Sequence, residues 1–171
     1  RRLPENNHRT RYLTEKEQQR LLRVCKSDSN LHDVVLLALL TGARRGEICG
    51  LRWRDVDLKN RTVTFVQTKN GEIRKVPLSD PAIALLRCRF SQRVKGMNDW
   101  VFPAEKSDGP VDVSHRFGRY AKKAGLEDFR FHDLRHSAAS AMARAGVPER
   151  QMQEVLGHKS CLLYTSPSPR D

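Results

Sequence analysis

The pentapeptide HDLRH at residues 132–136 and the heptapeptide TGARRGE at residues 41–47 carry most of the information in this sequence. If HDLRH lies on a helix, His132, Arg135 and His136 fall within one turn, so a guanidinium group and an imidazole can meet one ligand. Arginine offers a planar fork of N–H donors that matches a phosphate group, and TGARRGE supplies further arginines. The two stretches predict a site that holds a phosphodiester by charge, without an acidic metal cluster.

The charge balance indicates a polyanionic partner. The 171 residues include 32 Lys and Arg against 20 Asp and Glu, a formal net charge of +12 that is scattered along the whole sequence. Such an excess in a globular domain favours nucleic acid, although a merely soluble basic surface is the plainer alternative. With 38% hydrophobic residues the chain can bury one ordinary core, and no apolar run is long enough to span a membrane.

The cysteines and the first residues give more general indications. Cys25, Cys49, Cys88 and Cys161 form no CxxC pair and no zinc-finger cluster, so we expect reduced, mostly buried thiols in a cytoplasmic protein. Residues 1–12 are polar and basic without periodicity, and we interpret them as a linker from a missing upstream part.

Apolar periodicity predicts a mainly helical domain with one small antiparallel β-hairpin or sheet. The stretch TEKE at 14–17 is a capping box that begins the first helix, and glycines end several of the others. Alternating β-branched residues on both sides of a turn at 69–72 predict the hairpin over residues 62–78. Helices are expected over residues 14–26, 34–40, 45–53, 81–89, 114–124, 132–145 and 148–156.

Taken singly, each candidate residue could also play an ordinary structural role. Arg44 and Arg45 are adjacent and cannot point the same way on a helix. Glu47 could orient Arg44, or the two could form a plain surface ion pair. Lys69 alone would be a solvated turn residue, and LGH at 156–158 alone would be a helix end with a histidine near its negative dipole.

The two histidines of HDLRH could in principle bind a metal ion. His132 and His136 are four residues apart, which is also the spacing of two helical zinc ligands. The metalloprotease pattern, however, places Glu directly after the first histidine, and here Asp133 stands there without a convincing third ligand. We therefore expect no metal, and a His136 that packs in the core is an alternative to a catalytic one.

The order of the motifs is more specific than any one of them. TGARRGE is followed by TK at 68–69 in the hairpin turn, then by HDLRH and by LGH at 156–158. With the opening YLTEKEQQRLL, this order resembles the catalytic domain of the tyrosine recombinase or phage integrase family over residues 10–160. The resemblance implies that residues 13–160 form a recombinase catalytic domain with that family's fold, and that the linker at residues 1–12 comes from a missing N-terminal DNA-binding domain.

The resemblance also implies a role for each motif residue. Arg44 and Arg135 would clamp the scissile phosphate of DNA, and Lys69 would protonate the leaving 5′ oxygen. His132 and His158 would hydrogen-bond the same phosphate and assist proton transfer.

The resemblance further implies how the site is supported and what it acts on. Glu47 would support Arg44 from behind. The family uses no metal and no nucleotide cofactor, because a 3′-phosphotyrosyl linkage conserves the energy of the broken bond. The implied function is site-specific recombination or integration of double-stranded DNA by several protomers of a cytoplasmic protein, which is encoded by a bacterium or a phage. Two alternatives stay open: a type IB topoisomerase-like relaxase, and a non-catalytic DNA-binding module whose arginines contact backbone phosphates.

The nucleophile of the family is a tyrosine on a further helix downstream of LGH. Here the candidate is Tyr164, six residues after His158, in CLLYTSPSPRD at 161–171. Two prolines disfavour a helix in this stretch, which resembles the translation of a transposon-end sequencing adapter. We therefore expect the natural sequence to stop near Ser160, followed by a non-native, disordered tail. The chain is expected to bind DNA without an authentic nucleophile, and substitution by Tyr164 is the alternative.

Overall fold

The computed structural model describes residues 11–67, 71–96 and 98–157. Within these ranges the chain is mainly helical with a small antiparallel sheet, as the sequence predicts. Several predictions lie outside the described residues, namely those for most of the linker, for Lys69, His158 and Tyr164, and for the tail at 161–171.

A capping box begins the first helix. α1 spans Glu15–Cys25. The Oγ1 atom of Thr14 accepts a hydrogen bond from the backbone N of Glu17 at 3.2 Å, and Glu17 Oε1 accepts one from the backbone N of Thr14 at 3.1 Å. These two bonds satisfy backbone donors that a helix N-terminus leaves open, so the predicted start at TEKE is confirmed.

The second helix is longer than the sequence predicts. α2 spans Ser29–Thr41, whereas the apolar run predicted residues 34–40. It starts earlier because the carboxylate of Asp28 accepts from the backbone N of Leu31 at 3.1 Å and caps the first turn. α2 ends at Gly42, whose φ of 71° lies in the left-handed region that glycine adopts readily.

The helix predicted over residues 45–53 is shorter than expected. α3 spans Arg45–Cys49, and a 3-10 turn, η1, follows at Trp53–Asp55. The prediction was wrong beyond α3 because the backbone there bonds to a distant segment, as in the 3.0 Å bond from Val101 N to Leu51 O. The side chains that were predicted to face inward are nevertheless buried: Ile48, Leu51 and Trp53.

A three-stranded sheet covers one side of the helices. β1 spans Val56–Asp57, β2 spans Thr62–Gln67 and β3 spans Glu72–Pro77, in the antiparallel order β1-β2-β3. β2 and β3 are the hairpin that the sequence predicts over residues 62–78, and β1 adds a short edge strand. On β3, Arg74 faces inward and is only 9% exposed, so a charged side chain occupies a core position.

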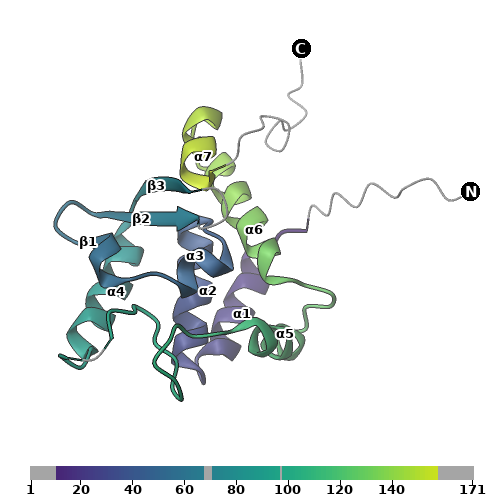
Figure 1. The fold of residues 1–171 in the computed structure, drawn as a ribbon. Coiled ribbons are helices and arrows are strands. Elements are labelled where there is room, and N and C mark those ends of the chain that lie inside the picture. The colour runs from purple at the N-terminus through teal and green to yellow at the C-terminus, as the bar shows by residue number, and fades with distance from the viewer. Residues whose placement is uncertain (1–10, 68–70, 97, 158–171) are drawn as a thin grey trace, which may run out of the picture.

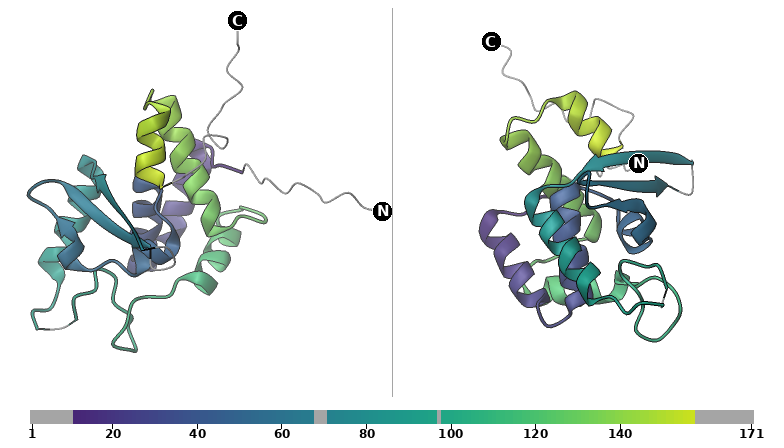
Figure 2. Two further views of the ribbon diagram at one scale, coloured as in Figure 1. Left: turned by 45° about the horizontal axis from the view of Figure 1, so that its top comes forward. Right: turned by 90° about the vertical axis from the view of Figure 1, so that its left-hand side faces the viewer.

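The remaining helices of the described chain close the domain around α2. They are α4 at Asp80–Gln92, α5 at Ser114–Lys123, α6 at Phe131–Arg144 and α7 at Glu149–Leu156. α2 runs through the centre and contacts α1, α3, α4 and α6, while α7 contacts both α6 and β3 (Figures 1 and 2). This arrangement brings the start of α3, the middle of α6 and the end of α7 to the C-terminal end of α2.

Candidate active site

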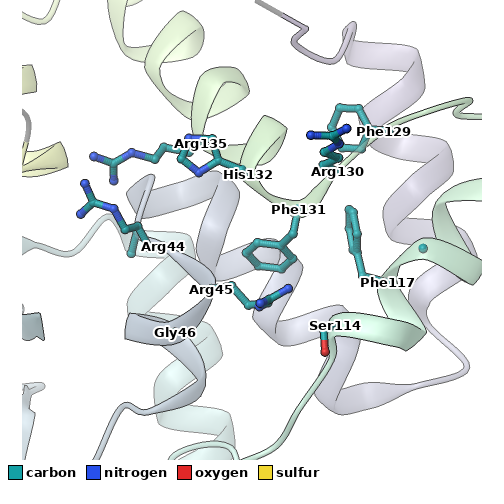
Figure 3. A pocket seen from close by; sticks show the side chains of 12 residues that line it. Arg44, Arg45, Gly46, Ser114, Phe117, Phe129, Arg130, Phe131, His132 and Arg135 are labelled. Atoms are coloured by element: carbon teal, nitrogen blue, oxygen red, sulfur yellow. The ribbon is translucent and has the colours of Figure 1, made fainter. Parts of the chain in front are cut away.

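A pocket of about 510 Å³ lies where α3, α5 and α6 meet, and it brings the two motif stretches together (Figure 3). No carboxylate belongs to the 12 described residues that line it. Basic side chains contribute to the lining from both motifs and from the chain just before α6: Arg44, Arg45, Arg130, His132 and Arg135. A pocket with this lining favours an anionic ligand.

Arg135 is held in the interior by backbone carbonyl groups. It is 3% exposed, its Nη1 donates to Gly42 O at 2.7 Å, and its Nη2 donates to Leu156 O. These two bonds fasten the guanidinium group to the C-terminal ends of α2 and α7. Because the guanidinium is planar, two fixed bonds also set the direction of all its N–H donors.

Arg44 lies at the N-terminal end of α3 and points toward Arg135. Figure 3 shows their guanidinium groups beside each other, whereas Arg45 points away toward Ser114, as their adjacency predicts. The Arg44 side chain is 34% exposed, and its Nη1 has no hydrogen-bond partner within the described residues. Two neighbouring cations repel each other, so an anion placed between them lowers the electrostatic energy.

His132 lines the same pocket, one helical turn before Arg135 on α6. Partial loss of hydration in the pocket lowers the pKa of His132 below its ordinary value of 6.5, and nearby His136, Arg135 and Arg44 lower it further. The imidazole is therefore mainly neutral at pH 7, where it offers one N–H donor and one acceptor. Such a group can hydrogen-bond a phosphate oxygen and pass a proton.

His136 packs edge to face against His132. Their ring centroids are 5.3 Å apart at an interplanar angle of 87°, and burial lowers the pKa of His136 as well. His136 is half-buried and does not belong to the residues that line the pocket. Across the described ranges, no group of three His, Cys, Asp or Glu side chains is placed to hold a metal ion.

Glu47 is buried, and its strongest partner is a residue that the sequence motifs do not include. Its side chain is 4% exposed, so the alternative of a plain surface ion pair with Arg44 is wrong. Glu47 Oε1 accepts from the backbone N of Arg44 at 2.9 Å. Its carboxylate also forms a bidentate pair with Arg74, through Nη1–Oε2 at 2.5 Å and Nη2–Oε1 at 3.1 Å. The available signal was the inward register of Arg74 on an alternating strand, where an arginine needs a buried partner.

The structure thus gathers three of the predicted catalytic side chains at one pocket: Arg44, His132 and Arg135. Glu47 contacts the first of them from the buried side. The predicted Lys69 and His158 belong to the residues that the structure does not describe.

This fold and this site define a class of protein. Residues 11–163 match the phage integrase family, and the chain belongs to that family. It is 37% identical to the integrase of Salmonella phage P22 over 170 residues, which cover 90% of this chain and 42% of that relative. It is 30% identical to the tyrosine recombinase XerA of Pyrococcus furiosus over 155 residues, which cover 86% of this chain and 53% of XerA. The chain therefore spans about half the length of these relatives or less.

Solved structures show the same fold. The crystal structure of XerA recombinase superposes with a TM-score of 0.78 at 29% identity, covering 90% of this chain and 58% of XerA. The catalytic domain of bacteriophage HP1 integrase superposes with a TM-score of 0.70 at 28% identity, covering 89% of this chain and 83% of that domain. Within the described part of the chain, no helix has the length and apolar character needed to cross a membrane.

Proposed function

We propose that residues 13–160 form the catalytic domain of a site-specific DNA recombinase or integrase, which breaks and rejoins duplex DNA through a 3′-phosphotyrosyl intermediate. The observation that carries the proposal is the convergence of Arg44, His132 and Arg135 on one pocket, which has no carboxylate among its described lining residues. Membership of the phage integrase family supports it, as do relatives that are themselves an integrase and a tyrosine recombinase.

The proposed chemistry follows from the charges in the pocket. Nucleophilic attack on a phosphodiester builds negative charge on its non-bridging oxygens. Preorganised donors such as the Arg44 and Arg135 guanidinium groups stabilise that charge by about 3–4 kcal/mol apiece, to judge by comparable oxyanion donors. His132 would hydrogen-bond the same phosphate, with Lys69 as the acid for the leaving 5′ oxygen and His158 as a further donor. Because the tyrosyl ester conserves the energy of the broken bond, the proposed reaction requires no nucleotide cofactor.

The proposed partner is double-stranded DNA, met by several protomers together. The net charge of +12 supports a polyanionic partner. The integrase of transposon Tn1549, whose fold matches this chain with a TM-score of 0.79 at 21% identity, was solved in complex with circular intermediate DNA. The XerH recombinase, with a TM-score of 0.71 at 24% identity, was solved bound to its difH substrate.

A covalent-trapping assay tests the proposal. Nicked duplexes of random sequence are incubated with the 171-residue chain and, separately, with the protein encoded by the reading frame recovered from its source DNA. Protein–DNA adducts that resist SDS are isolated, and their DNA is sequenced. Arg44→Ala and Arg135→Ala should each lower the adduct yield about 100-fold or more, since removal of one preorganised donor has that effect in other enzymes. Arg150→Ala removes the same charge from a side chain that is 92% exposed, and should leave the yield unchanged.

The outcomes separate the competing functions. Salt-sensitive duplex binding without adducts in either protein would contradict the proposal and support a non-catalytic DNA-binding module. Relaxation of supercoiled plasmid without strand exchange would support a topoisomerase-like relaxase instead. An adduct formed by the 171-residue chain and lost in Tyr164→Phe would contradict the expectation that Tyr164 is not the nucleophile.

A further inference from the structure

We infer that Arg74 is a positioning residue for the phosphate site: by neutralising Glu47 it keeps the Arg44 guanidinium available for phosphate, and it ties that pair to the end of α7. This inference rests on the proposed function, because it takes Arg44 to be a phosphate ligand. Arg74 lies on β3, outside the pocket lining, and so would act through Glu47 and Arg44 rather than by touching the substrate.

Glu47 lies between Arg74 and Arg44, and its carboxylate contacts Arg74 more closely than it contacts the Arg44 guanidinium. Its carboxylate meets Arg74 in two hydrogen bonds at 2.5 and 3.1 Å, with side chains that are 8% and 4% exposed. The nearest guanidinium atom of Arg44, Nη1, lies 3.7 Å from Glu47 Oε1 and makes no hydrogen bond among the described residues. The carboxylate therefore directs its charge mainly at Arg74 and holds Arg44 chiefly by the backbone N, at 2.9 Å.

Removing Arg74 would change which group Arg44 contacts. A buried carboxylate without its partner is costly, and the remaining cation within reach is Arg44, 3.7 Å away. The Arg44 guanidinium would move toward Glu47 to restore a buried ion pair, and a phosphate would then have to compete with that carboxylate. With Arg74 present, the pair Glu47–Arg74 is neutral as a unit and no such competition arises.

Arg74 also connects this pair to the far end of the site. Its Nε donates to Val155 O at 2.9 Å, and Arg135 donates to the next carbonyl, Leu156 O. Gly157 packs directly on Arg74, since a Cβ atom at that position would lie 2.7 Å from Arg74 Cδ. Two arginines thus cap consecutive carbonyls at the end of α7, and one of them belongs to the pocket. α7 and β3 contact each other, and Figure 1 shows them as neighbouring elements.

Binding of inorganic phosphate to the 171-residue chain, followed by NMR of the arginine side chains, tests the inference. Arg74→Met should weaken phosphate binding about tenfold, within the range of measured side-chain couplings. The double variant Glu47→Gln/Arg74→Met should bind within about threefold of the unsubstituted chain, because the Glu47 carboxylate that would withdraw Arg44 is gone, while the new amide oxygen can still accept from the Arg44 backbone N. A merely structural role predicts the opposite, namely that the second substitution adds to the damage.

The chain supplies a matched control in Arg89. Like Arg74, it is mostly buried, donates from Nε to a backbone carbonyl (Val101 O, 3.1 Å) and pairs through Nη1 with a carboxylate (Asp33 Oδ2, 2.8 Å). It lines no part of the phosphate pocket. Arg89→Met should therefore lower the unfolding temperature as Arg74→Met does, and leave phosphate affinity unchanged.

A second readout follows the position of Arg44 directly. The positive charge of Arg44 is one of the causes that hold the pKa of His132 below 6.5. If Arg44 moves toward Glu47 in Arg74→Met, the pKa of His132 rises, and the double variant returns it to the native value. The midpoint of the His132 Cε1–H chemical shift against pH measures this without any substrate.

The results distinguish a failure of the proposed phosphate site from a failure of the inference about Arg74. If the native chain does not bind phosphate, or binds it equally well in Arg44→Ala, the proposed phosphate site fails and the inference fails with it. If Arg44→Ala abolishes binding while Arg74→Met leaves it unchanged, or the double variant stays as weak as Arg74→Met, the inference alone is overturned. Should Arg74→Met not fold, Arg74→Lys and the double variant decide: the inference requires near-native binding in the double variant and intermediate binding in the lysine variant.

Discussion

Arg135 donates a hydrogen bond from Nη1 to the carbonyl oxygen of Gly42 at 2.7 Å, across 93 residues of sequence. Arg135 of HDLRH is thereby bonded to the backbone of Gly42 in TGARRGE. This bond joins the two motifs in addition to any ligand that both of them bind. Arg135 is thus part of the packed interior, whereas Arg44 is held at the pocket by the backbone of α3 and projects a partly exposed side chain.

The two pocket arginines should therefore differ in their effect on stability. Arg135→Ala leaves Gly42 O and Leu156 O without their donor, and we expect a loss of about 2–6 kcal/mol in the free energy of unfolding, at about 1–3 kcal/mol per buried unsatisfied group. Arg44→Ala should change it by no more than about 0.5 kcal/mol. Urea denaturation followed by circular dichroism measures both, and equal losses in the two variants would contradict the prediction.

Gly42→Ala should be more damaging than the same change at another helix end. Gly42 has a φ of 71°, and a Cβ atom there would collide with Leu156 Cδ2. Gly146 also has a positive φ, of 80°, but nothing lies within 4 Å of its Cβ position. We expect about 1–2 kcal/mol of destabilisation for Gly146→Ala from the backbone alone, and about 1–3 kcal/mol more for Gly42→Ala from overpacking. Thermal unfolding of the two variants side by side tests this, and equal shifts would exclude the collision.

Stability should fall as the pH drops below 6.5. Partial loss of hydration is the main cause that lowers the pKa of both His132 and His136 in the folded chain. The unfolded chain regains the ordinary value of 6.5, so between that value and the lowered ones the unfolded state binds more protons. The contribution of the two histidines is thus fully present above pH 6.5 and is lost as the pH falls toward their folded pKa values.

Urea midpoints at about pH 7.5 and about pH 5.5 measure this dependence across the histidine range. The double variant His132→Asn/His136→Asn should show a flatter pH profile than the native chain, since neither asparagine titrates. A native midpoint that rises on acidification would contradict the expected sign.

The described thiols should react in a fixed order. Burial raises the pKa of Cys25 and of Cys49 to about 11, whereas Cys88 is exposed. Because the thiolate is the reactive form, iodoacetamide at about pH 8 should modify Cys88 first and spare the other two until urea unfolds the chain. Peptide mass mapping measures each site separately. Early labelling of Cys25 or Cys49 in the folded chain would contradict their burial.

Local patterns in the sequence predicted the local structure well. The capping box at TEKE, the hairpin and the helices that end at Gly42, Gly125, Gly146 and Gly157 depend on neighbouring residues, so they can be inferred from the linear sequence. The helix predicted over 45–53 failed for a non-local reason: the backbone after α3 bonds to the segment around Val101, which periodicity does not reveal. The early start of α2 was missed because the cap at Asp28 precedes the apolar run.

In the candidate site, too, the residues of local motifs could be predicted, whereas a residue that depends on distant partners could not. Motif chemistry pointed to Arg44, His132 and Arg135, and the fold places them together. Arg74 was missed because its importance comes from partners 27 and 81 residues away, Glu47 and the Val155 carbonyl. An arginine on a strand is an ordinary residue until its register is known, and register is a property of the assembled sheet.

The attachment of Arg135 to carbonyls from both α2 and α7 has a consequence for a chain still leaving the ribosome. Leu156 is the last residue of the described helices, so the guanidinium group lacks one of its two anchors until α7 has been synthesised and folded. In a nascent chain, the direction of the Arg135 N–H donors is therefore fixed only after the last of the described helices has packed in place.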